Sequence, residues 1–263
     1  MADGIGSGVT STLTAIENGA SQIIAVGGEG TTNEVVNGIY KSNQSVKLGF
    51  IRSGTVNDYL HTINWPETLD DQISTIKQQE FHSTPLLEVS GQEESKIGLN
   101  VADIGVGAKI AYMASVDRKL TWIRGALRYQ LLSLRALFGW KNIPATIVID
   151  GEEYSDDLTL LTAGFSKYSG AYHLHPHAEP FGEKMAYTMA MNFSRWQMLT
   201  KMKMLERGDH TPDMDDIYMG HASRIEIRSE VPMLFEVDGE PFVERSKSVS
   251  ITALPSALEV MKI

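Results

Sequence analysis

Short apolar runs and stretches with helical spacing alternate along the first third of the chain. Residues 21–26 and 46–51 are apolar runs bounded by turn residues, which is typical of buried strands. Around them, the spacing of apolar residues predicts helices over 10–18, 32–40 and 69–79. Strand–helix–strand units of this length favour a parallel sheet with right-handed crossovers.

The pattern changes after about residue 81. Several runs now alternate apolar and polar residues, as Arg224 to Arg228 do, which favours antiparallel sheets with one exposed face. Two long stretches of helical spacing, 116–139 and 194–207, interrupt these runs. The predicted strands cover 86–89, 97–101, 145–149, 159–163, 185–191, 223–229, 233–237 and 246–252. The sequence therefore predicts an α/β domain over residues 1–84 and a β-rich domain over 85–253.

Composition limits the size of the core, the chemistry and the cellular location that can be expected of the protein. The 263 residues leave room for a sizeable core in one or two domains. The absence of cysteine rules out disulfides, thiolate zinc sites and thiol nucleophiles, and it is consistent with a cytoplasmic protein. No run of 18 apolar residues occurs, and the N-terminus lacks the basic start and apolar core of a signal peptide.

The charge is unevenly distributed. A formal net charge of −10 argues against nucleic acid as a partner, and an anionic membrane would have to meet a local basic patch. Residues 118–141 contain no acid and six basic residues, which are Arg118, Lys119, Arg124, Arg128, Arg135 and Lys141. Aromatic and leucine residues accompany them. The stretch is typical of a helix that lies on the inner membrane face, or of a core helix with a solvated basic side.

A glycine-rich turn, Gly27-Gly28-Glu29-Gly30-Thr31, follows the first predicted strand directly and opens a helix. Glycines let an anion approach the backbone, and the helix start offers free N–H groups, so the turn suits a phosphate. Asn33 follows in the first turn of the helix. The alternative is an ordinary strand–helix turn with a capping box between Thr31 and Glu34.

A second loop, after the predicted strand 46–51, carries Gly54, Thr55, Asn57 and Asp58. Both loops then lie at the carboxyl ends of neighbouring parallel strands, where open α/β sheets bind ligands. Their hydroxyl, amide and backbone N–H groups suit phosphates. The carboxylates of Glu29 and Asp58 suit Mg²⁺.

The two loops together resemble a known family. GGEGTTNEVVNG followed by LGFIRSGTVNDYL is similar to the diacylglycerol kinase catalytic domain of bacterial soluble lipid kinases, which itself resembles sphingosine kinases. Glu29 stands where the family usually has aspartate. The stretches 100–107 and 235–241 also match family motifs, so the resemblance covers nearly the whole chain in order.

The resemblance implies a fold and a ligand set. It implies an N-terminal α/β domain like those of NAD kinases and phosphofructokinases, to which residues 254–263 return. It also implies a sandwich-like C-terminal β domain, with the lipid bound in the cleft between the two. ATP and Mg²⁺ are the implied cofactors, and a homodimer is a possible assembly.

The resemblance also assigns roles to residues. It makes Asp238 the general base, supported by Glu240, although Asp238-Gly239 read alone is an ordinary β-turn. Glu29 and Asp58, whose carboxylates suit Mg²⁺, remain the expected metal ligands, and Asp58 is also expected to orient the network of the site. The implied nucleotide-binding set is Gly27, Gly28, Glu29, Gly30, Thr31, Asn33, Gly54, Thr55, Asn57 and Asp58.

Two departures from the family pattern leave alternatives open. The family's opening strand, which ends in Asn-Pro-x-Ser-Gly, has no counterpart here, and Phe181 stands where many members have an aspartate that helps to hold a structural Mg²⁺. We expect an ATP-dependent kinase of diacylglycerol or a related lipid, acting at the membrane surface. The alternatives are a catalytically impaired lipid- or nucleotide-binding relative and an NAD kinase-like enzyme with a soluble substrate.

Overall fold

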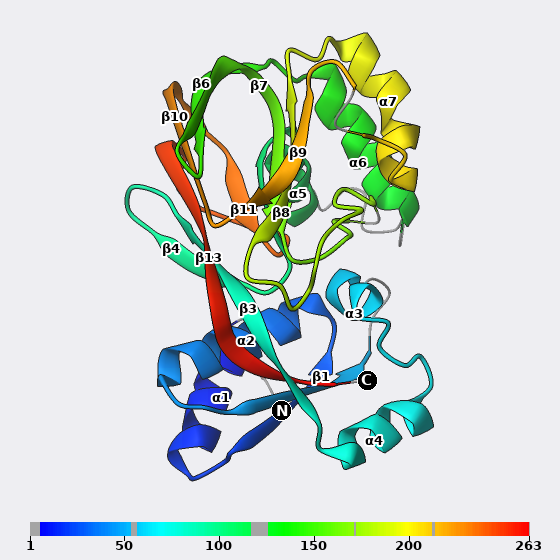
Figure 1. Ribbon diagram of the computed structural model, residues 1–263, viewed down its shortest axis with the longest axis vertical. Coiled ribbons are helices and arrows are strands. Elements are labelled where there is room, and N and C mark those ends of the chain that lie inside the picture. The colour runs from blue at the N-terminus through cyan, green and yellow to red at the C-terminus, as the bar shows by residue number, and fades with distance from the viewer. Residues whose placement is uncertain (1–5, 54–56, 117–125, 171, 212–213, 263) are drawn as a thin grey trace.

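The computed structural model describes residues 6–53, 57–116, 126–170, 172–211 and 214–262. The chain forms two lobes stacked along its longest axis (Figure 1). The first lobe carries α1 to α4 and the strands β1 and β2, and the second lobe carries the remaining helices and most of the strands. Within the described residues, no helix has the length and apolar character needed to cross a membrane.

The first lobe is built on a short parallel sheet. β1 (Gln22–Gly27) pairs with β2 (Lys47–Arg52) in parallel register from Gln22 opposite Lys47 to Gly27 opposite Arg52. α2 (Glu29–Ser42) forms the crossover between them and packs against α1 (Ser7–Glu17). This confirms the predicted α/β arrangement, which arises because both strands are apolar and flanked by polar turns.

The other two helices of the first lobe close its core. α3 (Asp58–Thr62) is a short helix that the sequence analysis missed, and α4 (Leu69–Gln78) matches its prediction closely. The Thr68 hydroxyl caps α4 by accepting the N–H of Asp71 at 3.2 Å. Phe50 lies at the centre of the core, edge-on to the rings of Tyr59 and Trp65.

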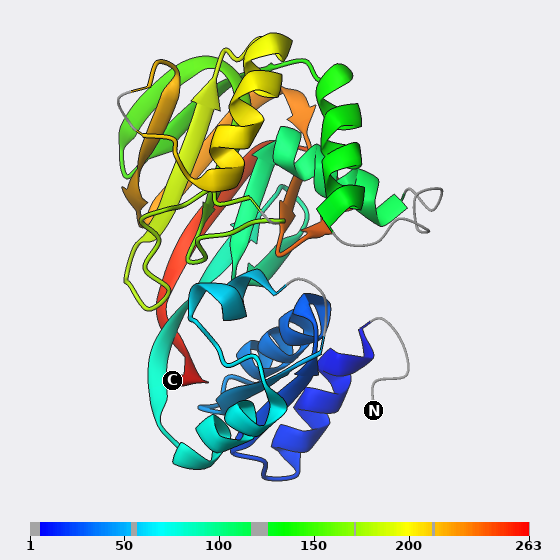
Figure 2. The ribbon, with the colours of Figure 1, turned by 90° about the vertical axis from the view of Figure 1, so that its right-hand side faces the viewer.

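The second lobe is mostly antiparallel sheet with three helices on one side (Figure 2). The helices α5 (Val106–Val116), α6 (Ala126–Phe138) and α7 (Arg195–Arg207) cover β7 and β8 through a separate apolar cluster. The strands are β3 (Phe81–Ser90), β4 (Ser95–Gly98), β5 (Val101–Gly105), β6 (Ile143–Ile149), β7 (Glu152–Gly164), β8 (Met185–Met191), β9 (Ile217–Ala222), β10 (Arg224–Met233), β11 (Phe235–Val237), β12 (Glu240–Pro241) and β13 (Ser246–Met261).

Two long strands run through both lobes. β3 and β13 pair antiparallel from Ser250 opposite Ser90 to Met261 opposite Phe81, with a register shift between Leu254 and Leu258. The far end of β13 also pairs in parallel with β2, through Glu259 and Val260. The lobes therefore share a continuous hydrogen-bonded sheet. A division into domains at 84/85 would fall inside β3, and it stays a prediction.

Three local predictions were wrong. The predicted strand 97–101 is divided into β4 and β5, because the carboxylate of Asp238 takes the N–H groups of Leu99, Asn100 and Val101 at the break. The predicted helix 116–139 is divided into α5 and α6, with 117–125 outside the described residues. The sequence analysis also missed β9 altogether.

The close packing of β5 on β7 gives a test of this fold. Gly164 lies against Val101, and a methyl group at position 164 would collide with the backbone oxygen of Asn100 and lie 2.7 Å from the Val101 Cα. We expect Gly164→Ala to lower the free energy of unfolding by about 2 kcal/mol, measured by urea denaturation.

Gly30→Ala is the matched control for this substitution. A Cβ at position 30 would have no neighbour within 4 Å, and the residue lies in the first turn of α2. Its unfolding midpoint should stay near that of the unsubstituted protein. Equal destabilisation by the two alanines would contradict the packing assigned to Gly164.

Candidate active site

The glycine-rich turn lies where β1 ends and α2 begins. α2 starts at Glu29, after Gly28 in an extended conformation, and no side chain caps it. A Cβ at Gly27 would lie only 2.5 Å from the Thr31 hydroxyl, so glycine is required for this tight entry. The first-turn N–H groups and the positive end of the helix dipole form a site that suits a phosphate.

The capping box proposed between Thr31 and Glu34 is wrong. Both oxygens of the Glu34 carboxylate instead accept backbone N–H groups from the start of α1, those of Gly6 and Gly8, at 2.7 Å each. Glu34 thus fixes α1 against α2. The first N–H groups of α2 therefore have no side-chain cap.

The second loop lies beside the first, as predicted. The Ser53 N–H donates to the Gly27 oxygen at 2.9 Å, and Gly28 approaches the Ser53 oxygen. The loop's Asp58 N–H donates to Glu29 Oε1 at 2.8 Å, which joins the two motifs directly. Asn57 is buried, and its amide nitrogen has no partner among the described residues. The predicted residues Gly54 and Thr55 lie outside the described part of the chain.

The carboxylates of Glu29 and Asp58 are electrostatically crowded. Burial and the nearby charge of Asp58 raise the pKa of Glu29 to about 7, although the Asp58 N–H partly offsets this. Burial raises the pKa of Asp58 to about 6, against the stabilising N–H of Gly170, which donates to Asp58 Oδ2 at 2.7 Å. A divalent cation would relieve this repulsion.

Asp238 holds the site together across the two lobes. Its Oδ2 accepts the Asn33 amide at 3.0 Å and the Leu99 N–H at 2.7 Å, and its Oδ1 accepts the N–H groups of Asn100 and Val101 at 2.8 and 3.1 Å. Its backbone is left-handed, with φ 52°. Burial of the carboxylate raises the pKa of Asp238, and these four donors oppose the rise.

The structure separates Asp238 from its predicted helper. Glu240 is exposed in β12 and does not line the pocket around Asp238. The buried neighbour is Glu236, which is 1% exposed and accepts the Gly239 N–H at 2.6 Å. The supporting role of Glu240 stays a prediction, but its position does not favour it.

Glu236 faces a second carboxylate that the sequence analysis did not single out. Asp103 on β5 lies directly opposite Glu236 on β11, and both are buried. Burial raises the pKa of Glu236 well above its ordinary value, and the nearby Asp103 carboxylate adds to the rise. The sequence did contain a signal for this pair, because each of the two strands carries one acidic residue among apolar or small ones.

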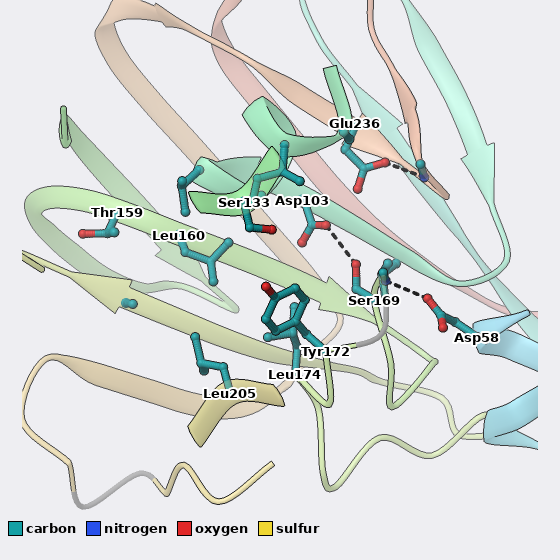
Figure 3. A pocket seen from close by; sticks show the side chains of 18 of the residues that line it. Asp58, Asp103, Ser133, Thr159, Leu160, Ser169, Tyr172, Leu174, Leu205 and Glu236 are labelled. Atoms are coloured by element: carbon teal, nitrogen blue, oxygen red, sulfur yellow. Dashed lines mark hydrogen bonds between the residues drawn. The ribbon is translucent and has the colours of Figure 1, made fainter. Parts of the chain in front are cut away.

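One pocket collects these groups. Its polar end, which we call the carboxylate mouth, consists of Glu29, Asp58, Asp103, Glu236 and Asp238. From there the pocket continues between the sheet and the helices α5, α6 and α7 (Figure 3). We call this continuation the apolar channel; the apolar residues that line it are Val106, Ile110, Ala111, Leu137, Leu160, Leu174, Ala190, Phe193, Met198 and Leu205.

The residues of the mouth fit a magnesium–nucleotide complex better than a metal bound by protein alone. Among the described residues there is no cluster of three or more His, Cys, Asp or Glu side chains placed to hold a metal ion. Glu29 and Asp58 offer two hard oxygen ligands, and Mg²⁺ commonly takes its remaining ligands from phosphates and water. Phe181 stacks on the ring of His82 with centroids 4.4 Å apart, so it offers no metal ligand.

Comparison with known protein families gives two consecutive matches. Residues 5–89 match the family described as the diacylglycerol kinase catalytic domain. Residues 100–262, more than half of the chain, match the one described as the YegS C-terminal NAD kinase beta sandwich-like domain. Residues 90–99, which include β4, lie between the two matched segments, and the second segment starts at Asn100, one of the residues whose N–H group Asp238 accepts.

Curated relatives and solved structures agree with these matches. A diacylglycerol kinase of Staphylococcus saprophyticus is 26% identical over 90% of this chain and 75% of its own length, and one of Staphylococcus aureus is 28% identical over 90% and 73%. A diacylglycerol kinase structure from Bacillus anthracis covers 99% of this chain and 83% of its own, with a TM-score of 0.72 and 18% identity. Yeast NADH kinase covers 94% and 62%, with a TM-score of 0.54 and 12% identity. The predicted fold class is confirmed.

The buried pair of Glu236 and Asp103 predicts a pH-dependent stability. Because the pKa of Glu236 is higher in the folded than in the unfolded protein, the folded state keeps a proton that the unfolded state releases above about 4.5. The free energy of unfolding therefore falls as the pH rises from there through the folded-state pKa. Glu236→Gln, which carries no charge, should be more stable than the unsubstituted protein at pH 8 by about 1 kcal/mol.

Urea denaturation between pH 5 and pH 8 measures this effect. Glu240→Gln, which alters the exposed neighbour, should follow the unsubstituted protein across the whole range. Parallel curves for Glu236→Gln and the unsubstituted protein would show that Glu236 titrates normally.

Proposed function

This chain belongs to the diacylglycerol kinase family, and we propose that it transfers the γ-phosphoryl group of ATP to the hydroxyl group of a membrane lipid, with diacylglycerol as the first candidate. The observation that carries the proposal is the composition of the pocket. Five carboxyl groups gather at one end, between the lobes, and the other end is lined by aliphatic and aromatic side chains of the second lobe. A lipid with a small polar head and a long apolar tail has this same distribution of polarity.

The nucleotide is proposed to bind on the first lobe. The uncapped start of α2 supports this, since its N–H groups and dipole favour phosphate oxygens. Glu29 and Asp58 would hold the magnesium ion of the nucleotide, and the ion, when bound, supplies the positive charge that phosphoryl transfer needs. Asn57, whose buried amide nitrogen has no partner among the described residues, would donate to an oxygen of the same ligand.

Asp238 is proposed to accept the proton of the lipid hydroxyl. Its raised pKa supports this role, since a base works best when its pKa approaches the working pH. Its four N–H donors keep the carboxylate in one orientation between the lobes. Asn33 therefore acts as a positioning residue for Asp238 as well as belonging to the predicted nucleotide site.

A membrane surface is the proposed place of action. On α6, Leu131, Leu134 and Phe138 are spaced along one face, and they are exposed although large and apolar. Trp196, at the start of α7, is 74% exposed. Both helices also line the apolar channel. The first basic residues of 118–141 and the side chain of Arg128 lie outside the described part, so the membrane-binding role of that stretch remains a proposal.

The activity is tested by incubating the purified chain with radiolabelled ATP, Mg²⁺ and mixed micelles of diacylglycerol. We expect labelled phosphatidate, and Asp238→Asn should lower kcat/KM at least about 100-fold. Circular dichroism would establish that the variant is folded. Tight binding of ATP–Mg²⁺ without transfer to any lipid of a total extract would instead support a catalytically impaired relative, and phosphorylation of NAD would support a soluble-substrate kinase.

A second substitution tests the role of Asp238 as a base. The Asn33 amide lowers the pKa of Asp238 by donating to its carboxylate. Asn33→Ala should therefore raise that pKa, and the acid limb of the kcat/KM–pH profile should move to higher pH. Lys41→Ala is the control, because Lys41 lies in the last turn of the same helix and is exposed. The same acid limb in both variants would rule out Asp238 as the titrating base.

A further inference from the structure

Two buried hydroxyl groups in the pocket are not accounted for by phosphoryl transfer. Ser133, on α6, is 1% exposed, and Tyr172 is half-buried with its hydroxyl oxygen inaccessible to solvent. Both line the pocket beyond the carboxylate mouth, and their hydroxyl groups point into the same part of it (Figure 3). Neither oxygen has a partner in hydrogen-bonding geometry among the described residues, although the two hydroxyls lie close enough for Ser133 to lower the pKa of Tyr172. Buried hydroxyl groups without partners are costly, so their presence calls for an explanation.

A third hydroxyl group in the same wall, that of Thr159, has hydrogen-bond partners within the protein, as buried hydroxyl groups usually do. The Thr159 hydroxyl donates to Asn142 Oδ1 and accepts the Phe193 N–H, both at 3.0 Å. Its hydrogen bonds are satisfied within the protein, and it has no need of a ligand. Ser133 and Tyr172 differ from Thr159 in this respect although all three line one pocket.

The position of Tyr172 is fixed relative to the carboxylate mouth. Ser169 and Tyr172 exchange two backbone hydrogen bonds of 2.9 Å, which close a tight turn. From this turn the Ser169 hydroxyl donates to Asp103 Oδ2 at 3.1 Å and the Gly170 N–H donates to Asp58 Oδ2. The turn therefore holds mouth carboxylates on one side and directs Tyr172 into the channel on the other (Figure 3).

The unsatisfied groups change from acceptors to donors along the pocket. At the mouth, Asn100 Oδ1 is a buried acceptor without a donor among the described residues. Further in, Ser133 and Tyr172 offer O–H donors, and burial raises the pKa of Tyr172, which keeps its proton in place. Beyond them the wall is mainly apolar, with the ammonium group of Lys201 held over the ring of Phe193. A ligand that matches this order has a hydroxyl, then a carbonyl oxygen, then an aliphatic chain.

We propose that Ser133 and Tyr172 donate hydrogen bonds to an ester carbonyl of the lipid, and that they thereby select ester-linked acyl chains over ether-linked alkyl chains. The inference deepens the proposed function and rests on its placement of the lipid hydroxyl at the carboxylate mouth. An ether-linked chain fills the same channel but has no carbonyl oxygen. It would leave both buried donors unpaired, and sites built for a hydrogen bond reject analogues that cannot make it.

The test compares two probes that differ only in this group, 1,2-dioctanoylglycerol and its dioctyl ether analogue. Binding to the whole purified chain is measured by isothermal titration calorimetry without ATP, and kcat/KM is measured with ATP–Mg²⁺. The unsubstituted protein should bind the ester about 10-fold or more tightly than the ether. Ser133→Ala and Tyr172→Phe should each weaken ester binding about fivefold and leave ether binding unchanged.

Matched controls are available outside the pocket. Ser115→Ala, on α5, and Tyr218→Phe, on β9, remove exposed hydroxyl groups and should preserve the ester-to-ether ratio. Equal affinity of the unsubstituted protein for both probes, or an equal loss for both in the variants, would overturn the inference even if phosphate is transferred. Selective ester binding without phosphate transfer would uphold the inference and count against the proposed kinase activity.

Discussion

The contact on which the site depends is the carboxylate of Asp238 accepting N–H groups from both lobes. One oxygen takes the Asn33 amide of the first lobe together with the Leu99 N–H, and the other takes the N–H groups of Asn100 and Val101. The same bonds interrupt the strand that would otherwise continue from β4 into β5. Asn100, at the break, and Asp103, in β5, both line the pocket. One side chain therefore both ends β4 and helps to form the pocket.

The crowding of carboxylates around that contact has an electrostatic cost. Each of Glu29, Asp58, Glu236 and Asp238 has a pKa raised by burial, and the neighbouring acids add to several of these shifts. A protein selected for stability alone would not collect such groups in one pocket. Their arrangement is more typical of a site that is completed by a cation and a polar ligand.

The sequence predicted what depends on local order and missed what depends on distant partners. β1, α2 and β2 were predicted well, because apolar runs and glycine turns specify them within about 30 residues. The break at residues 99–100 could not be predicted in this way, since its cause lies 138 positions away at Asp238. Glu34 fitted a local capping box, but the backbone of α1 offered better donors. For Asp103 and Glu236, the sequence showed only an acidic residue within an apolar strand, and it did not show that the two strands pair.

The long strand β13 has a consequence for how the molecule is assembled. β2 obtains its second neighbour from Glu259 and Val260, and the apolar cluster of the first lobe includes Leu258, Val260 and Met261. During synthesis, the first lobe therefore leaves the ribosome with one edge of its sheet unpaired and its core incomplete. That edge stays open until the whole second lobe has been made. The lobe that is synthesised first is thus completed last. Its sheet and core can form fully only after the end of β13 has been synthesised.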